Sequence, residues 1–358
     1  MTRKGVWNLQ QVRDKYLQSL WANDIHMYGW GYNINGTVGN NTRSTVMGSS
    51  PVQIGTDTNW NSFEQKLSMG AGYFMLATKS DGTIWSWGLN GYGQLGQNQN
   101  ELGATPQRSS PTQIGSGTDW SNEISRGSQF ASATKTDGTL WMWGVNTYGQ
   151  LGQNSTLSPG LGGISSPVQV PGTTWSKSHV GNRHTLAIKT DGTLWSWGYG
   201  SAGALGQNQP NSGSNYSSPV QIPGTNWKDC YAGNQRSAAT TTDGELFIWG
   251  PNINGCLGQN QSQSNYDNAS SPIQIAGTTW DYFTWITTGG WQSIKTDGTL
   301  WGCGRMNYGA GEHAAPATVL ADGISSPIQI GSDSTWDSIT SWGYGTSALK
   351  STLTPSQL

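Results

Sequence analysis

The chain has 358 residues, a net charge of −2 and three cysteines. Charged residues make up 11% of it, against about 25% in a typical domain, which argues against electrostatic capture of nucleic acid. No apolar run approaches the roughly 20 residues of a membrane-spanning helix, so we expect no membrane insertion. The N-terminus lacks the apolar core of a secretory signal. The cysteines, at 230, 256 and 303, have no metal-binding spacing, so we expect free thiols.

The first 22 residues contain one amphipathic segment. Asn8 can cap a helix, with Gln11 three positions later as its partner, and the spacing predicts a short helix over about residues 8–21. The apolar residues of this segment are Val6, Trp7, Leu9, Val12, Tyr16 and Leu20. Two readings stay open: a helix packed over one end of the domain, or an arm that docks on a partner or a neighbouring subunit.

A ten-residue phrase that reads as strand, tight turn, strand then recurs through the chain. Its form is clearest in Lys189–Gly198, where Asp191-Gly192 supplies the turn and Leu194, Trp195 and Trp197 lie in the second strand. The copies are Lys79–Gly88, Lys135–Gly144, Lys189–Gly198, Thr241–Gly250 and Lys295–Gly304. Such internal repeats indicate a repeat architecture in which each unit is one small supersecondary element.

Two more phrases complete each unit. Gly-Gln-Leu-Gly-Gln-Asn stands at 93–98 and 149–154, and Ser-Ser-Pro-x-Gln recurs with prolines at 51, 111, 167, 219, 272 and 327. Four short strands repeated about every 55 residues are typical of a propeller blade. We therefore predict an all-β fold, a six-bladed β-propeller of four-stranded antiparallel blades, over residues 23–351, followed by a tail at 352–358.

The first and last copies are each incomplete. Asn23–Gly31 resembles the Trp-x-Trp-Gly strand without the strand that should precede it, and Thr346–Lys350 resembles Thr185–Lys189, after which the repeat stops. The two ends of the chain therefore supply complementary halves of one unit. We predict that the first and last strands pair and close the ring.

The motif set resembles the repeats of the regulator of chromosome condensation family. It comprises Asp-Gly-x-(Leu/Ile)-Trp-x-Trp-Gly, Gly-Gln-Leu-Gly and the segment Gly181-Asn-Arg-His-Thr185, and covers about residues 23–351. The resemblance implies a β-propeller, with seven blades in the founding members where this chain has six units. It implies no single function, because the family includes nucleotide exchange on a small GTPase with chromatin binding, β-lactamase inhibition and UV-B sensing.

No group of residues has the pattern of a catalytic or metal site. His184 occupies a repeat position held elsewhere by Phe74 or Phe130, which indicates a structural role. The recurring aspartates each open an Asp-Gly turn, which needs that pair in any case. The 20 tryptophans fall at fixed positions in the repeat and indicate packing rather than light sensing. We expect a non-enzyme without cofactor or metal.

Binding is the remaining class of function. The units differ most in the segments 40–48, 97–108, 153–164, 207–216, 259–269 and 312–324. A propeller places equivalent loops on one face, where recognition usually occurs, although length-tolerant loops without a partner are equally consistent with them. The candidate binding residues in these segments are Arg43, Arg108, Tyr216, Tyr266 and His313.

Residues 3–21 resemble the N-terminal segment of structural proteins of tailed bacteriophages, on the residues Gly5-Val-Trp-Asn-Leu-Gln10. With the nearly uncharged surface, this predicts a phage virion structural protein of tail-fibre, tail-associated or decoration type. Its arm would bind other virion proteins, the propeller would bind a host-surface protein or glycan, and the chain would form a homo-oligomer in the particle. The alternative is a cellular, cytoplasmic protein-interaction scaffold of the same family.

Overall fold

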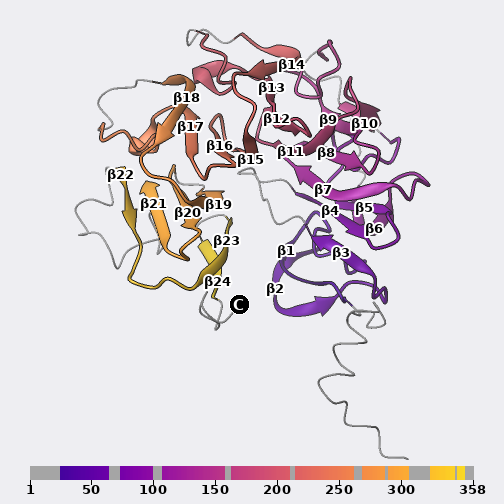
Figure 1. The fold of residues 1–358 in the computed structure, drawn as a ribbon. Coiled ribbons are helices and arrows are strands. Elements are labelled where there is room, and N and C mark those ends of the chain that lie inside the picture. Colours follow the sequence, from indigo (N-terminus) through magenta and orange to yellow (C-terminus); the bar gives the residue numbers. More distant parts are fainter. Residues whose placement is uncertain are drawn as a thin grey trace, which may run out of the picture.

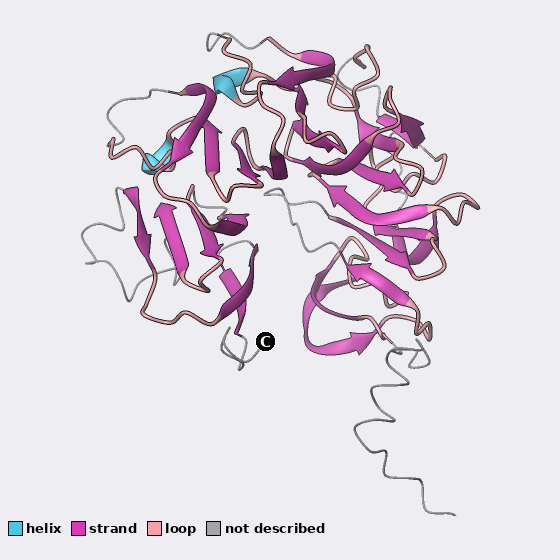
Figure 2. Cartoon of the chain, in the orientation of Figure 1, coloured by secondary structure: helices cyan, strands magenta, loops and turns pink. Residues whose placement is uncertain are grey.

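In the computed structural model the chain forms a ring of small antiparallel sheets (Figure 1). The structure describes residues 25–63, 73–99, 107–157, 163–209, 214–261, 268–286, 289–305, 323–342 and 345–350. Within these residues there are five four-stranded sheets and two two-stranded sheets, and the helical elements are two single 3₁₀ turns (Figure 2). The predicted N-terminal helix and C-terminal tail lie outside the described residues.

The complete blades follow one another along the chain. Blade 1 contains β3 (Trp60–Phe63), β4 (Phe74–Lys79), β5 (Ile84–Gly88) and β6 (Arg108–Gln113). Blade 2 contains β7 (Trp120–Arg126), β8 (Phe130–Lys135), β9 (Leu140–Val145) and β10 (Gly163–Gln169). Blade 3 contains β11 (Trp175–Val180), β12 (His184–Lys189), β13 (Leu194–Gly198), the turn η1 (Ser201–Gly203) and β14 (Tyr216–Ile222).

Blade 4 contains β15 (Trp227–Ala232), β16 (Ser237–Thr241), β17 (Leu246–Gly250), the turn η2 (Ile253–Gly255) and β18 (Ala269–Ile275). Blade 5 contains β19 (Trp280–Trp285), β20 (Trp291–Lys295), β21 (Leu300–Gly304) and β22 (Ile324–Gln329). The N-terminal half-blade is β1 (Tyr28–Asn33) and β2 (Ser44–Gln53), and the C-terminal half-blade is β23 (Trp336–Trp342) and β24 (Gly345–Lys350).

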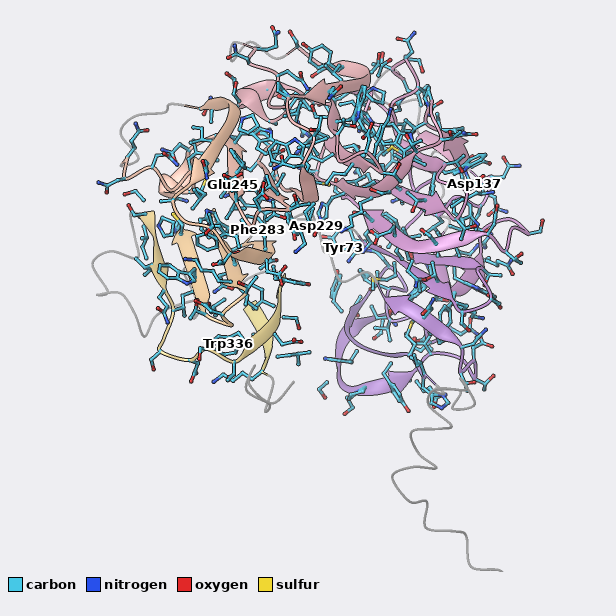
Figure 3. All side chains as sticks on the ribbon, in the orientation of Figure 1. Tyr73, Asp137, Asp229, Glu245, Phe283 and Trp336 are labelled. Carbon is cyan, nitrogen blue, oxygen red and sulfur yellow. The ribbon has the colours of Figure 1, made fainter. Side chains whose placement is uncertain are left out.

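The first strand of each blade lies nearest the middle of the ring. β11 packs against both β7 and β15, the first strands of the flanking blades, and β19 packs against β23. Asp229 and Phe283, from first strands, lie near the middle in Figure 3. The fourth strands, which carry the Ser-Ser-Pro phrase, lie at the periphery (Figure 1). This order exposes the connections of the blades on the two faces of the ring.

The Asp-Gly turns have the role that the sequence predicts. Asp191 Oδ1 accepts hydrogen bonds from the backbone N of Thr193 at 3.0 Å and from its Oγ1 at 2.6 Å. The bond from the Thr193 hydroxyl is the main reason why the pKa of Asp191 lies below its usual value. Gly192 has a φ of +77°, and a Cβ there would lie 2.3 Å from the carbonyl oxygen of Thr225. Only glycine satisfies both conditions.

A buried indole joins each blade to the one before it. Trp197 is fully buried on β13, and its Nε1 donates to the carbonyl oxygen of Gln150 in blade 2 at 2.9 Å. A Cβ on Gly152 would lie 3.0 Å from this nitrogen, which explains the second glycine of the Gly-Gln-Leu-Gly phrase. The equivalent donors in blades 1, 2 and 4 are Trp87, Trp143 and Trp249, at 2.9–3.0 Å.

Blade 5 forms the same link from a different strand. Cys303 stands on β21 where the other blades have the buried tryptophan. Trp291, on the neighbouring strand β20, donates its indole N–H to the carbonyl oxygen of Cys256 at 2.8 Å. The fold therefore retains the donor although the repeat position has lost it.

Uncharged side chains form a second link between blades. Asn154 has a φ of +54° and donates its backbone N–H to the carbonyl oxygen of Ser217 in the next blade, at 2.7 Å. The next serine, Ser218, donates to Asn154 Oδ1 at 3.3 Å. Asn41, Asn98, Asn208 and Asn260 repeat the backbone contact. The abundance of Asn and Ser in this chain therefore has a structural explanation.

Burial determines the chemistry of the cysteines. Cys230, Cys256 and Cys303 are all buried thiols that form no disulfide, which confirms the prediction. Burial raises the pKa of the Cys303 thiol well above its ordinary value, so its reactive thiolate form is suppressed.

His184 is also structural, as predicted. It is buried on β12, and its Nε2 lies 2.9 Å from Ser237 Oγ of blade 4. The Ser237 hydroxyl donates to the carbonyl oxygen of Ala204 at 2.8 Å, so the imidazole Nε2 donates to Ser237. Burial lowers the pKa of His184 from 6.5 to about 4.

The ring is not closed in this structure. β1 pairs with β2 and β23 pairs with β24, but the two half-blades form separate sheets on either side of the opening in Figure 1. The coarse prediction of an all-β fold built from about six four-stranded units is confirmed, whereas the predicted pairing of the first and last strands is not formed. Each hairpin forms between neighbours in the sequence, whereas closure must bring the two ends of the ring together.

We predict that His184→Phe reduces the acid sensitivity of the fold, because phenylalanine occupies this position in blades 1 and 2. Between pH 6.5 and about 4 the unfolded chain binds a proton that the folded chain does not. The stability due to neutral His184 is therefore present above pH 6.5 and falls with pH. Denaturant unfolding at pH 7 and pH 4.5 should show the wild type losing about 2 kcal/mol more than the variant. Equal losses in both proteins would contradict this.

Candidate functional site

Four of the five complete blades hold a lysine whose ammonium lies over two aromatic rings. In blade 3 the Nζ of Lys189 lies 4.8 Å from the ring centroid of Trp175 and 4.2 Å from that of Trp195. Lys79, Lys135 and Lys295 repeat the arrangement in blades 1, 2 and 5, at 3.7–5.0 Å. An ammonium within about 6 Å of a ring face is attracted by the ring quadrupole. We call this position the lysine slot.

The pairing register of the first two strands determines the position of the lysine. The last residue of the second strand pairs with the first residue of the first strand, so Lys189 lies opposite Trp175. The ring on the third strand is held from below by the turn, because Trp195 Nε1 donates to Thr193 Oγ1 at 2.9 Å. Besides the first-strand tryptophan, the slot therefore depends on three positions. These are the lysine, the threonine after Asp-Gly, and the tryptophan two residues later.

Blade 4 differs from the other complete blades at all three positions. Thr241 lies opposite Trp227, at the register that the lysines occupy elsewhere. Glu245 replaces the threonine that follows Asp-Gly, and Phe247 replaces the third-strand tryptophan. Because phenylalanine has no ring N–H, position 245 no longer has to accept a hydrogen bond. The side chain at 245 is thereby released for another role.

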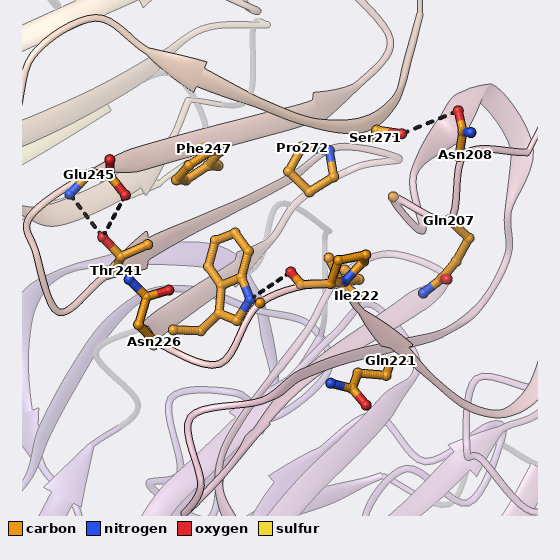
Figure 4. Close-up of a pocket in the computed structure, with 14 residues that line it drawn as sticks. Gln207, Asn208, Gln221, Ile222, Asn226, Thr241, Glu245, Phe247, Ser271 and Pro272 are labelled. Atoms are coloured by element: carbon orange, nitrogen blue, oxygen red, sulfur yellow. Dashed lines mark hydrogen bonds between the residues drawn. The ribbon is translucent and has the colours of Figure 1, made fainter.

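These residues line a cavity of about 500 Å³ between blades 3 and 4 (Figure 4). Blade 4 contributes Trp227, Thr241, Glu245 and Phe247, and the facing wall is made by Gln207, Gln221, Ile222, Pro223 and neighbouring residues. The equivalent cavity between blades 1 and 2, which contains Lys135 and Trp120, measures about 360 Å³. The change from lysine to threonine therefore goes with a larger cavity.

Among the residues that the structure describes, the carboxylate of Glu245 has neutral partners. Its Oε1 accepts from Gln274 Nε2 at 3.0 Å and its Oε2 accepts from Thr241 Oγ1 at 3.3 Å. Among the described residues, no lysine or arginine forms an ion pair with it. In blades 1 and 2, by contrast, a carboxylate pairs with the lysine in the slot, Asp57 with Lys79 at 2.9 Å and Asp119 with Lys135 at 3.1 Å. We call the equivalent position in blade 4 the Thr241 slot: it has two rings and a carboxylate, but no cation.

The structure brings some of the predicted loop residues together. Arg43 is exposed, and its Nη1 donates to Gln107 Oε1 at 2.8 Å, while Gln107 Nε2 donates to Asn35 Oδ1 at 3.1 Å. Arg108 begins β6 and its guanidinium donates to Gln99 Oε1. The variable segments of the N-terminal half-blade and blade 1 are therefore in contact, as expected for equivalent loops.

Other predicted residues lie elsewhere. Tyr216 is the first residue of β14, where it lies opposite Gly198 and packs, partly buried, against the buried cluster that contains Trp197. It is therefore a strand residue rather than a loop residue. Tyr266, His313 and the residues of the proposed docking arm lie outside the described residues. The described residues contain no cluster of three or more His, Cys, Asp or Glu suited to a metal ion. No helix among them is long and apolar enough to cross a bilayer.

The Thr241 slot is absent from the sequence-based predictions. Thr241–Gly250 was recognised as one more copy of the repeated phrase, and its three departures from the other copies are visible in the sequence. The sequence does not show that Glu245 and Phe247 lie beside Thr241 at the place where Thr241 faces Trp227. That follows from the strand register.

A ring of repeated four-stranded antiparallel sheets defines the class of β-propellers. The model of the regulator of chromosome condensation (RCC1) repeat matches residues 81–133, 137–188, 191–240 and 243–294, and a second model of this repeat matches residues 65–94. The chain belongs to this family, as its motifs indicated.

The curated relatives match this chain over about half of their own length. The chain is 30% identical over 241 residues to the RCC1 domain-containing protein RUG3, mitochondrial, of Arabidopsis thaliana, which covers 64% of this chain and 51% of the relative. It is 26% identical over 254 residues to the ultraviolet-B receptor UVR8 of the same plant, covering 70% and 54%. The chain thus spans about half the length of these curated relatives.

Solved structures show the same fold. Human WBSCR16 matches with a TM-score of 0.64 at 14% identity, over 91% of this chain and all of the other. Prp20p of Saccharomyces cerevisiae matches with a TM-score of 0.61 at 15% identity, over 95% of this chain and 96% of the other.

The prediction of a bacteriophage virion protein is wrong. The relatives and structural neighbours reported above are proteins of plants, human and yeast. The resemblance that suggested a phage lies in residues 3–21, outside the described residues. The uncharged composition has the structural cause described above, because Asn and Ser form hydrogen bonds between blades. Virion partners, glycans and a location in the virion have no support from these relatives.

We predict that Lys189→Met destabilises the fold by about 1–2 kcal/mol, because it removes the ammonium from two indole rings and keeps most of the aliphatic packing. The measurement is the free energy of unfolding in urea. Lys228→Met is the matched control: Lys228 is half-exposed and forms an ion pair with Asp281, which contributes about 0–1 kcal/mol. Equal losses in the two variants would show that the rings add nothing.

Proposed function

We propose that this chain is a non-enzymatic protein-interaction scaffold. The observation that carries the proposal is the framework of hydrogen-bonded blades, on which loops from neighbouring units meet and bond to one another. Loops held on a rigid framework are common recognition surfaces. Proteins of the same fold support it. Prp20p binds Gsp1p and histones, and another structure contains Kap60 bound to yeast RCC1 (Prp20). We further propose a cellular location, the cytoplasm being our prediction.

The test is capture of a partner by the tagged chain, followed by binding measurements on the purified pair. Arg43→Ala with Arg108→Ala, on the face of the variable segments, should weaken binding by about tenfold, as loss of anchoring contacts does. Thr190→Ala is the control, because Thr190 is exposed next to the Asp-Gly turn at the opposite end of the strands. A partner that binds both variants equally, or no stoichiometric partner at all, would contradict a scaffold acting through this face.

We also infer that the two half-blades pair in the native ring and complete a sixth blade. The first and second strands of a blade correspond to β23 and β24, and the third and fourth to β1 and β2. Lys350 lies 4.4 Å from the ring of Trp336, as lysines of the slot do, and Tyr28 stands at the repeat position of its second ring. Tyr28, Trp30 and Leu349 are 49%, 62% and 66% exposed, and pairing would bury them.

By analogy with blade 3, where Ala187 pairs with Trp195, the register of this pairing sets Ala348 opposite Tyr28. The double variant Tyr28→Cys/Ala348→Cys should therefore form an intramolecular disulfide on mild oxidation, detected by mass spectrometry and non-reducing electrophoresis. Tyr28→Cys/Leu349→Cys is the control, because a shift of one residue places the second thiol on the other face of the sheet. Cross-links between chains, or none, would contradict closure by the chain's own ends.

A further inference from the structure

The lysine slots of the other blades define the group that fits this geometry. In blades 1, 2, 3 and 5 an ammonium lies 3.7–5.0 Å from two ring centroids, on a stem of four methylenes. The chain therefore contains four examples of an alkylammonium bound over two rings in this geometry. Each is supplied from within the blade itself.

Blade 4 keeps the rings of the slot. Trp227 and Phe247 lie edge to face with centroids 5.2 Å apart and planes at 72°. The corresponding pair in blade 3, Trp175 and Trp195, has centroids 6.1 Å apart and planes at 76°. Thr241 is buried at the lysine position, and its short side chain does not extend over the rings as a lysine would. The aromatic part of the site is thus retained in a larger cavity.

Blade 4 also gains a carboxylate at this point. Glu245 lines the cavity, and its described partners are the neutral side chains of Thr241 and Gln274. A carboxylate beside two ring faces favours a cation over an anion or a neutral group. The remaining wall includes Pro223 and Pro272, whose apolar surface suits the methylene stem of a lysine.

From these contacts we propose that the Thr241 slot binds the side chain of a lysine presented by a protein partner. The stem lies along Pro223 and Pro272, and the ammonium lies over the rings of Trp227 and Phe247 and donates to Glu245. The site takes from outside the group that the other complete blades supply from their own second strand. This assignment of a partner rests on the proposed scaffold function, whereas the affinity of the slot for an alkylammonium does not.

The alternative is that blade 4 is a degenerate copy of the repeat with no ligand. Its three changes, at Thr241, Glu245 and Phe247, would then only preserve the packing. Glu245 would then serve only to accept hydrogen bonds from Thr241 and Gln274, and Phe247 only to fill space. This alternative predicts no preference for a cation. It also predicts that other blades would not acquire binding when their lysine is removed.

The direct test is titration of the full chain with Nα-acetyl-lysine N-methylamide. Binding is monitored by the NMR signals of the tryptophan indoles. We expect millimolar binding that shifts Trp227, and binding of the neutral Nα-acetyl-norleucine N-methylamide that is weaker by about tenfold or more. Glu245→Gln should weaken lysine binding by about fivefold or more while the fold stays intact. Equal binding of the two probes would overturn the proposal and leave an apolar crevice.

Two substitutions test the slot from opposite directions. Thr241→Lys supplies the ammonium internally, so it should abolish probe binding. Lys135→Thr leaves Trp120, Trp141 and the carboxylate of Asp119 in blade 2, so it should create a second binding site. Probe binding unchanged by Thr241→Lys, or no new site in Lys135→Thr, contradicts the proposal. If Thr241→Lys does not fold, Glu245→Gln and Lys135→Thr decide.

The partner is tested separately with the complex captured under the proposed function. If the slot holds the partner's lysine, Thr241→Lys should weaken that complex by about tenfold, and the lysine probe should compete with it. If the probe binds but the capture experiment recovers no partner, the scaffold function is refuted and the slot remains an alkylammonium site. A partner that binds Thr241→Lys normally would refute the partner lysine while the scaffold function stands.

Discussion

The structure depends on one kind of buried hydrogen bond that recurs in every complete blade. It runs from an indole N–H of one blade to a backbone carbonyl of the blade before it. An unpaired N–H at this depth would cost about 1–3 kcal/mol, so its acceptor must be brought close. Closeness requires a glycine beside the indole, since a Cβ on Gly206 would lie 2.8 Å from Trp249 Nε1. The repeated glycines and tryptophans of the sequence are thus two sides of the same contact.

Local features were predictable because they depend on neighbours in the sequence. The Asp-Gly turns, the strands that flank them and the structural role of His184 follow from turn chemistry and from equivalent repeat positions. Features that depend on the approach of separate strands were not predictable. Trp291 takes over the role lost at Cys303 from the next strand, and this becomes visible only when both strands are placed against Cys256.

The candidate site shows the same division. The changes at Thr241, Glu245 and Phe247 could be read from the sequence, but each alone resembles ordinary drift in a repeat. Their meaning comes from the register, which sets Thr241 opposite Trp227, and from the cavity that the adjacent blade completes. The mistaken phage interpretation has the opposite origin. It assigned a functional meaning to an uncharged composition that inter-blade hydrogen bonds require.

The indole bonds also give the ring a direction. Each complete blade donates to the blade that precedes it, so the series runs one way around the ring and never reverses. In the closed ring that we propose, Trp30 stands at the donor position of the sixth blade, and it is largely exposed here. Ends of this kind differ from each other, like the two ends of a filament. Contact between them is necessarily head to tail, within one molecule or between copies, and it cannot produce a symmetric face-to-face dimer.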